Sequence, residues 1–316
     1  MTQRVPASVA DRLRIPAIAA PMLAVSGPEL VAAACRAGVV GAFPTANARS
    51  VTELDDWFGQ LAGERDSDRA DGAGDWAPWC PNLIIRQPRL AEDVEVLVRH
   101  RVEMVITSVG SPAAVVPTLH DAGALVLADV ATLRHAERAV EAGVDGLVLL
   151  TAGAGGQTGW LNPFAFAREV RRFFDGVLVL AGGIGDGIAL RAATTLGCDL
   201  GYLGTRFIAT RESRAADEYK QMLVGAGMDD VVLTKAFTGL ATSMLRPSIE
   251  AAGLEVDRLD EQVTQETAAA MFGSGADGPR RWSQIWSAGH SVSSVEDVPT
   301  VAELVDRLAK EYASAG

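Results

Sequence analysis

Residues 141–150 read EAGVDGLVLL, in which a helical pattern stops at a glycine and an apolar strand begins at once. Related phrases stand elsewhere in the chain, as CRAGVVGAF (35–43), HDAGALVLA (120–128) and TLGCDLGYLG (195–204). A glycine just past the end of a helix caps it by taking the left-handed conformation. The recurring phrase therefore predicts a chain in which helices alternate with strands.

Eight short apolar runs are strand candidates, and many are followed by a polar or glycine-rich loop and then a helical pattern. They are IPAIAAP (15–21), VVGAFPT (39–45), CPNLII (80–85), VEMVITSV (102–109), ALVLADV (124–130), DGLVLLTAG (145–153), VLVLAGG (177–183) and LGYLGT (200–205). Strands that are apolar throughout are buried on both faces, as in a parallel sheet wrapped by helices. Eight βα units favour an α/β fold of the (β/α)8 TIM-barrel type, with a doubly wound open sheet as the alternative.

Two stretches depart from this repeat. GERDSDRADGAGDWAP (63–78) is acidic and glycine-rich without periodicity, which predicts a solvated loop without a function of its own. Beyond residue 210, helical segments such as RAADEYKQMLVGAG (214–227) and RLDEQVTQETAAAMFG (258–273) replace the strand pattern. We therefore expect a barrel over 1–210, a smaller helical insertion over 211–289 beside the barrel mouth, and a segment over 290–316 that returns to the barrel.

The 316 residues are 48% hydrophobic and carry a formal net charge of −12. The chain can therefore bury a large core, while nucleic acids and anionic membranes both require a basic face, so neither is an expected partner. The N-terminus lacks the apolar core of a signal peptide and no stretch is long enough to span a membrane, which predicts a cytoplasmic protein. The three cysteines and four histidines are scattered without metal-ligand spacing, so no metal site is predicted.

Glycine-rich loops follow the last two strand candidates. AGGIGDG (181–187) and LGTRF (203–207) would let backbone amides approach an anion, and late-strand loops of TIM barrels often bind phosphate. We therefore predict a phosphate cradle at Gly182, Gly183, Gly204 and Thr205, with tight βα turns as the alternative for either loop alone. No GxGxxG begins a helix after the first strand and no GxxxxGK[ST] occurs, so a mononucleotide such as FMN is the expected ligand.

Seven motifs follow one another along nearly the whole chain: AAPM (19–22), PNL (81–83), GAGGQTG (153–159), AGGI (181–184), LGTRF (203–207), FTG (237–239) and SAGH (287–290). Together they resemble the nitronate monooxygenase family, also called 2-nitropropane dioxygenases, and the related FMN-dependent enoyl-ACP reductases. The resemblance implies an FMN-binding TIM barrel with a smaller helical domain. It implies flavin contacts at Pro21, Met22, Asn82, Gly155, Gly156, Gly182, Gly183, Gly204 and Thr205.

Asp129 ends the run ALVLADV, at a strand end that also faces the flavin in this family. The residue could alternatively cap the helix that follows directly, and the two roles can coexist.

Two catalytic candidates follow from the resemblance. Many family members carry a histidine over the flavin after the glycine pair, where this chain has Gln157. A neutral amide donates and accepts hydrogen bonds but cannot take a proton near pH 7, so Gln157 is expected to orient a nitro, carbonyl or carboxylate oxygen. The family commonly has SAGQ where this chain has SAGH, so His290 could reach the pocket from the opposite side or be an exposed loop histidine.

Aromatic residues accompany both loops. Asn162 and Pro163 are predicted to begin a helix as its N-cap and first residue, and Trp160 is expected to pack in the core or at the pocket rim. Trp282 and Trp286, at a spacing of one helical turn, could form an apolar lid over the flavin or anchor the insertion to the barrel.

Three functions are consistent with these features. The first is an FMN-dependent oxidoreductase of nitronate monooxygenase type, which oxidises a small alkyl nitronate with O2. The second is a reductase of the same superfamily that passes hydride from NAD(P)H to a quinone, an enone or an enoyl thioester. The third and most remote is a flavin-free barrel that binds a phosphorylated metabolite.

Overall fold

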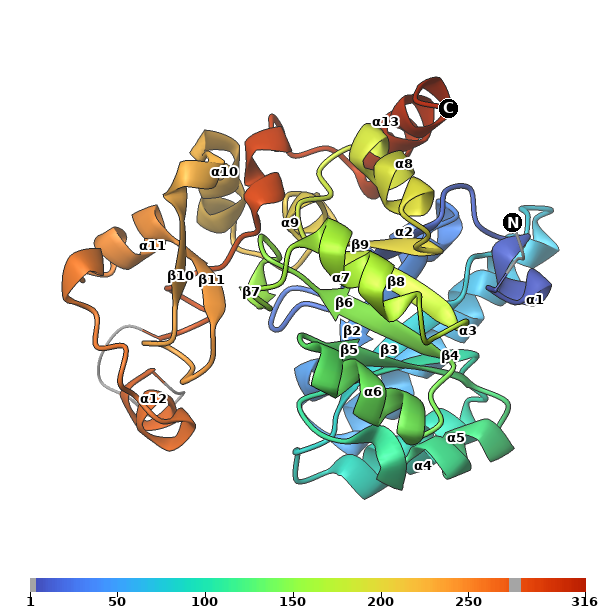
Figure 1. Cartoon of the computed structure of the whole chain (residues 1–316). Helices are drawn as coiled ribbons and strands as arrows, with labels where there is room; N and C mark the ends of the chain where they lie inside the picture. Colours follow the sequence, from blue (N-terminus) through green and yellow to red (C-terminus); the bar gives the residue numbers. More distant parts are fainter. Residues whose placement is uncertain (1–3, 273–279) are drawn as a thin grey trace.

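The computed structural model describes residues 4–272 and 280–316. Its parallel strands close into a barrel of eight, in which each strand pairs with the next and the last pairs with the first (Figure 1). The strands are β1 Ala17–Ala19, β2 Val40–Pro44, β3 Trp79–Ile84, β4 Met104–Ser108, β5 Leu125–Val130, β6 Gly146–Leu150, β8 Val177–Ala181 and β9 Leu200–Leu203. Each falls on one predicted run, so the TIM barrel is confirmed and the open sheet is wrong.

Helices wrap the barrel: α1 Ala7–Ala10, α2 Pro28–Arg36, α3 Val51–Ala70, α4 Leu90–Arg99, α5 Val116–Asp121, α6 Leu133–Glu141, α7 Pro163–Val170, α8 Gly187–Thr195, α9 Thr205–Ile208 and α13 Val301–Ser314. Four of them end where the recurring glycine phrase predicts. Gly38, Gly123, Gly143 and Gly197 follow α2, α5, α6 and α8 with φ between +82° and +100°. Because glycine takes this conformation without steric penalty, each helix can stop there and the next strand can begin at once.

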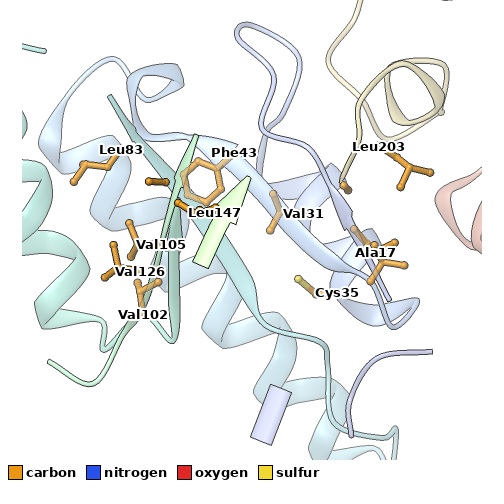
Figure 2. Close-up of a cluster of buried hydrophobic side chains, with 14 of the residues drawn as sticks. Ala17, Val31, Cys35, Phe43, Leu83, Val102, Val105, Val126, Leu147 and Leu203 are labelled. Carbon is orange, nitrogen blue, oxygen red and sulfur yellow. The ribbon is translucent and has the colours of Figure 1, made fainter. Parts of the chain in front are cut away.

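The side chains of the strands alternate between two apolar cores, as the period of a strand requires. One set packs against the helices and includes Leu83 and Val126, which Figure 2 shows among the buried side chains of this layer. The other set fills the barrel and includes Cys80 and Leu127. A residue two positions beyond an inward-facing one, such as Asp129, therefore faces the barrel mouth.

The acidic segment predicted as a solvated loop is helical in its first half and a loop in its second half, residues 71–78. Its first half, residues 63–70, belongs to α3. Arg36 of α2 pairs with Asp68 at 2.6 Å, and the Trp76 indole donates to the same carboxylate at 3.0 Å. Trp76 is only 3% exposed. The loop prediction was therefore wrong for residues 63–70 and is confirmed for residues 71–78. It failed in the first half because Asp68 finds its partner Arg36 on another helix, where local composition does not reveal it.

The insertion contains strands that the sequence did not predict. β10 (Val231–Thr234) and β11 (Thr242–Leu245) pair antiparallel, and β11 also pairs with β7 (Gly156–Gln157) of the loop after β6. The insertion also holds α10 Asp217–Gly225, α11 Arg246–Ala251 and α12 Gln265–Phe272, and it lies to one side of the barrel in Figure 1. The prediction of a helical segment without strands was wrong, and its part at 273–279 lies outside the described residues.

The chain returns to the barrel through α13, which packs against the start of α8. A Cβ on Gly187 would lie 2.2 Å from the carbonyl oxygen of Leu308, so glycine is required for this close approach. The remaining short helices are η1 Thr45–Asn47, η2 Pro112–Ala114, η3 Met228–Asp230, η4 Val256–Arg258 and η5 His290–Ser294. Within the described ranges, no helix combines the length and apolar character needed to cross a membrane.

Candidate functional site

A cavity of about 230 Å³ opens at the barrel mouth, between the carboxyl ends of the strands and the insertion. Its barrel side is formed by strand-end residues and by the glycine-rich loops that follow the strands. The strand-end residues are Asn82, Ser108, Asp129, Leu150, Ala181 and Tyr202. The insertion side includes Tyr219, Trp282 and Trp286. The cavity thus lies at the face where TIM barrels place their active sites.

Asp129 is the one acidic side chain that lines the cavity among the described residues. Its Oδ1 atom is buried and finds no hydrogen-bond partner in that part of the chain. Burial raises the pKa of the Asp129 carboxyl to about 7, because the charged form loses its water. The alternative role as a helix cap is wrong, since Thr132 caps α6 by accepting from the His135 N–H at 3.1 Å. A buried carboxyl without a partner, facing a cavity, marks a position for a ligand.

Polar contacts hold the predicted flavin-contact residues of the third strand and of the loop after the first strand. Ser108 donates from its hydroxyl to Oδ1 of Asn82 at 3.1 Å, which orients the Asn82 carboxamide. Pro21 and Met22 line the cavity from the loop after β1. Asn47 holds this loop, because its Nδ2 donates to the Met22 carbonyl at 2.9 Å. The structure therefore brings Pro21, Met22 and Asn82 into one cavity with Asp129.

The predicted phosphate cradle also lies in this cavity, which Gly182, Gly183, Gly204 and Thr205 all line. The backbone N–H groups of the three glycines donate to no acceptor within the described chain. A Cβ on Gly182 would lie 2.4 Å from Oγ1 of Thr151, whereas a Cβ on Gly183 would meet no atom within 4 Å. Free backbone donors around an open approach, beside the Thr205 hydroxyl, fit a phosphoryl group.

Gln157 reaches the cavity from β7, where its backbone pairs with Thr242 of the insertion. The side chain is exposed, and its carboxamide has no hydrogen-bond partner among residues 4–272 and 280–316. Gly155 and Gly156 line the cavity beside it. A Cβ on Gly155 would lie 2.7 Å from the backbone nitrogen of Gly289, so the two loops touch through bare backbone. The carboxamide of Gln157 therefore lies at the cavity with its hydrogen-bonding groups open to a ligand.

His290 does not join Gln157. It is exposed and is not among the residues that line the cavity. Its backbone N–H donates to the Gly153 carbonyl at 2.9 Å, and its ring lies against the position where Gly153 lacks a Cβ. The structure therefore favours the alternative of an exposed loop histidine beside Gly153, and a catalytic role of His290 stays a prediction.

The aromatic predictions have mixed outcomes. Asn162 caps α7 as predicted, because its Oδ1 accepts from the Phe164 N–H at 3.0 Å, with Pro163 as the first helical residue. Trp160 is 81% exposed, so its expected packing is wrong. Trp282 and Trp286 line the cavity, but from a turn in which Trp282 has φ +67°, and not from a helix.

The cavity residues that the sequence did not single out include Ser108, Tyr202 and Tyr219. Ser108 and Tyr202 stand at the inward-facing ends of predicted strands, so the strand period could have identified them. Tyr219 had no such signal, because it comes from α10 of the insertion. Burial raises the pKa of the Tyr219 hydroxyl to about 12, so this residue is a neutral part of the wall.

Comparison with known proteins agrees with this geometry. Residues 9–311 match the family described as nitronate monooxygenase. A nitronate monooxygenase from Paraburkholderia phytofirmans is 29% identical over 94% of this chain and 92% of its own length. The structure of a nitroalkane oxidase from Streptomyces ansochromogenes is 26% identical, covers 98% of this chain and 99% of its own, and has a TM-score of 0.76.

A further structure, FabK from Thermotoga maritima, has a TM-score of 0.79 at 24% identity over 98% of this chain and 97% of its own, which shows a shared fold. The resemblance inferred from the seven motifs is confirmed, because the family match spans nearly the whole chain. The protein belongs to the nitronate monooxygenase family and is an enzyme, an oxidoreductase of the flavin-dependent type.

Proposed function

We propose that the protein binds FMN non-covalently and oxidises small alkyl nitronates with O2. The glycine cradle would hold the FMN phosphate through backbone N–H groups. Contacts to the flavin would come from Pro21, Met22, Asn82, Asp129, Gly155 and Gly156. FMN supplies the redox chemistry when bound, taking electrons from the substrate and passing them to O2.

The observation that carries this proposal is the unpaired carboxamide of Gln157 in the cavity. Its NH2 group can donate to an oxygen of a nitronate and fix the orientation of the substrate. An amide cannot act as a base near pH 7. A nitronate has already lost its α-proton, so its oxidation needs no base. No histidine, lysine or arginine of the described residues lines the cavity, and Asp129 is the one carboxyl there that could take an α-proton. The nitronate needs no such base, so it is a better candidate than the neutral nitroalkane.

A flavin reductase that takes hydride from NAD(P)H is the second candidate. The same carboxamide can donate to the carbonyl oxygen of a quinone, an enone or an enoyl thioester. The lack of a histidine, lysine or arginine at the cavity, within the described ranges, is equally compatible with hydride transfer, because that step removes no proton from carbon.

An anaerobic visible spectrum distinguishes the two functions. The purified protein is mixed with propyl nitronate in one cell and with NADPH or NADH in parallel cells. Loss of the oxidised flavin spectrum with the nitronate alone is the expected result. Bleaching by a nicotinamide alone would instead identify a reductase, and a colourless protein that releases no flavin on denaturation would rule out both.

A further inference from the structure

Three aromatic side chains line the insertion side of the cavity, and we call them the aromatic wall: Tyr219, Trp282 and Trp286. The rings of Tyr219 and Trp286 are stacked, with centroids 4.9 Å apart and planes at 9°. Tyr219 is 4% exposed, while Trp286 is half-buried. Trp286 therefore has a planar partner in the protein and still contributes surface to the cavity.

The stacked pair is held rigidly by hydrogen bonds to the insertion sheet and its neighbours. The backbone N–H of Trp286 donates to Oγ of Ser248 at 2.9 Å, and the Trp286 carbonyl accepts from the Leu245 N–H at 2.8 Å. The Tyr219 hydroxyl donates to the Ser287 carbonyl, so the Tyr219 ring is bonded to the same short segment whose backbone carries Trp286. A surface fixed before a ligand arrives loses little conformational freedom on binding, which favours a defined ligand shape.

Trp282 adds a strained element to the wall. Its φ of +67° lies in the left-handed region, which bulky side chains rarely adopt. Its N–H donates to the Ile285 carbonyl at 3.0 Å, and its ring packs on the apolar cluster of the insertion. Strain of this kind persists where the surroundings over-determine it, and such positions cluster at ligand sites.

The charges around the cavity limit what the wall can bind. The described lining includes no cationic side chain, and its one carboxyl, Asp129, belongs to the barrel strand β5. The wall therefore offers no cationic partner for an ion pair, and what its rings offer is apolar contact and ring stacking. A planar unsaturated group gains from both, whereas a saturated group of similar size gains only from the first.

We propose that the aromatic wall binds a planar aromatic group of the substrate, so that the protein prefers arylalkyl over saturated alkyl substrates. This inference rests on the proposed function for the identity of the reacting group. The nitronate end would lie toward Gln157, and the uncharged aryl end would stack against the surface that Trp286 presents. The wall thus sets specificity without taking part in the redox chemistry.

Two matched pairs of compounds test the inference on the FMN-loaded protein. The nitronates of 1-nitro-2-phenylethane and 1-nitro-2-cyclohexylethane share the same reacting group and differ in ring type alone. The amides 3-phenylpropanamide and 3-cyclohexylpropanamide are uncharged and unreactive, and calorimetry gives their Kd without turnover. We expect the phenyl member of each pair to be preferred by roughly three- to tenfold, the range for one aromatic contact.

Trp286→Leu should bring both ratios close to one, whereas Trp160→Leu, at an exposed tryptophan outside the cavity, should leave them unchanged. Equal or weaker binding of the phenyl amide to the unaltered protein overturns the inference, and this measurement decides it even if Trp286→Leu does not fold. Turnover of propyl nitronate without a phenyl preference overturns the inference about the aromatic wall and leaves the proposed function standing. A phenyl preference among the amides without nitronate turnover supports the inference about the aromatic wall and overturns the proposed function.

Discussion

The two sides of the cavity differ in how they are built. On the barrel side, residues such as Asn82 and Asp129 stand two positions beyond buried inward-facing residues of regular strands. On the insertion side, Tyr219 comes from a helix and Trp286 from an irregular segment far along the chain. The barrel side presents free backbone donors and one carboxyl, whereas the insertion side presents stacked rings.

This difference separates two tasks. Parallel strands bring their carboxyl ends to one edge, so a repeated strand pattern places polar groups together for a phosphate and a flavin. The insertion has no such repeat, and its surface can vary without disturbing the barrel. We therefore expect substitutions on the barrel side to change stability and cofactor binding, and those on the insertion side to change substrate preference.

The largest expected effect is on the barrel side, at Asp129. The pKa of its carboxyl is raised from the ordinary 3.8 to about 7 in the folded chain. Between these two pH values the folded state keeps the proton, whereas the unfolded state releases it. Stability of the FMN-free protein should therefore fall as pH rises from about 4 to 7, by up to about 4 kcal/mol. The figure is an upper limit because the residue is partly exposed to the cavity.

Asp129→Asn removes this titration, so the free energy of unfolding of the variant should not fall in this way. The difference in stability between the variant and the unaltered protein should therefore grow in favour of the variant as the pH rises from about 4 to 7. Urea unfolding at pH 5 and pH 8 measures it. Parallel pH curves for the two proteins would show that the Asp129 carboxyl does not carry the buried proton.

A second large effect is expected in the glycine cradle. Gly182→Ala places a Cβ 2.4 Å from Oγ1 of Thr151 at a φ of +123°, so the loop must move. We expect a loss of about 3 kcal/mol in stability, with loss of bound FMN. Gly72→Ala is the matched control, because Gly72 has φ +83° with no atom within 4 Å of the added Cβ.

The control should cost about 1 kcal/mol and leave FMN bound. Flavin absorbance after gel filtration and thermal unfolding read out both variants. Full FMN occupancy in Gly182→Ala would argue against the cradle.

At the boundary between the two sides, Gln157→Ala should lower kcat/KM for propyl nitronate by about 10- to 100-fold. The reason is the loss of one hydrogen bond to a charged oxygen, which contributes roughly 1.5–3 kcal/mol. His290→Asn, outside the cavity, should change kcat/KM by less than about twofold. A larger effect at His290 than at Gln157 would reverse the assignment made from the structure.

The smallest effect is expected behind the aromatic wall, at Ser248. Ser248→Ala removes the acceptor of the Trp286 backbone N–H and should cost about 1 kcal/mol in stability. The loosened backbone at Trp286 should reduce the phenyl preference without loss of FMN, measured with the amide pair. An unchanged preference would mean that the stack with Tyr219 alone holds Trp286.

The barrel side was largely predictable from the sequence, and the insertion side was not. The eight strands and the capping glycines follow from local patterns, and the positions of Gly182 and Asn82 follow from the strand ends. Only the first half of the acidic segment, residues 63–70, was misjudged, because Asp68 there pairs with Arg36 of another helix. β11 was missed because its partners include a two-residue strand from a barrel loop.

The sequence by itself determined which segments are strands, where helices stop, and that glycine-rich loops meet at one face. Those features depend on residues a few positions apart, through period, capping and backbone freedom. The tertiary structure alone decided that the Asp129 carboxyl lacks a partner among the described residues, that His290 does not line the cavity, and that Tyr219 stacks on Trp286. The direction of a side chain in an irregular segment, and the partners it finds, depend on long-range packing that no local pattern encodes.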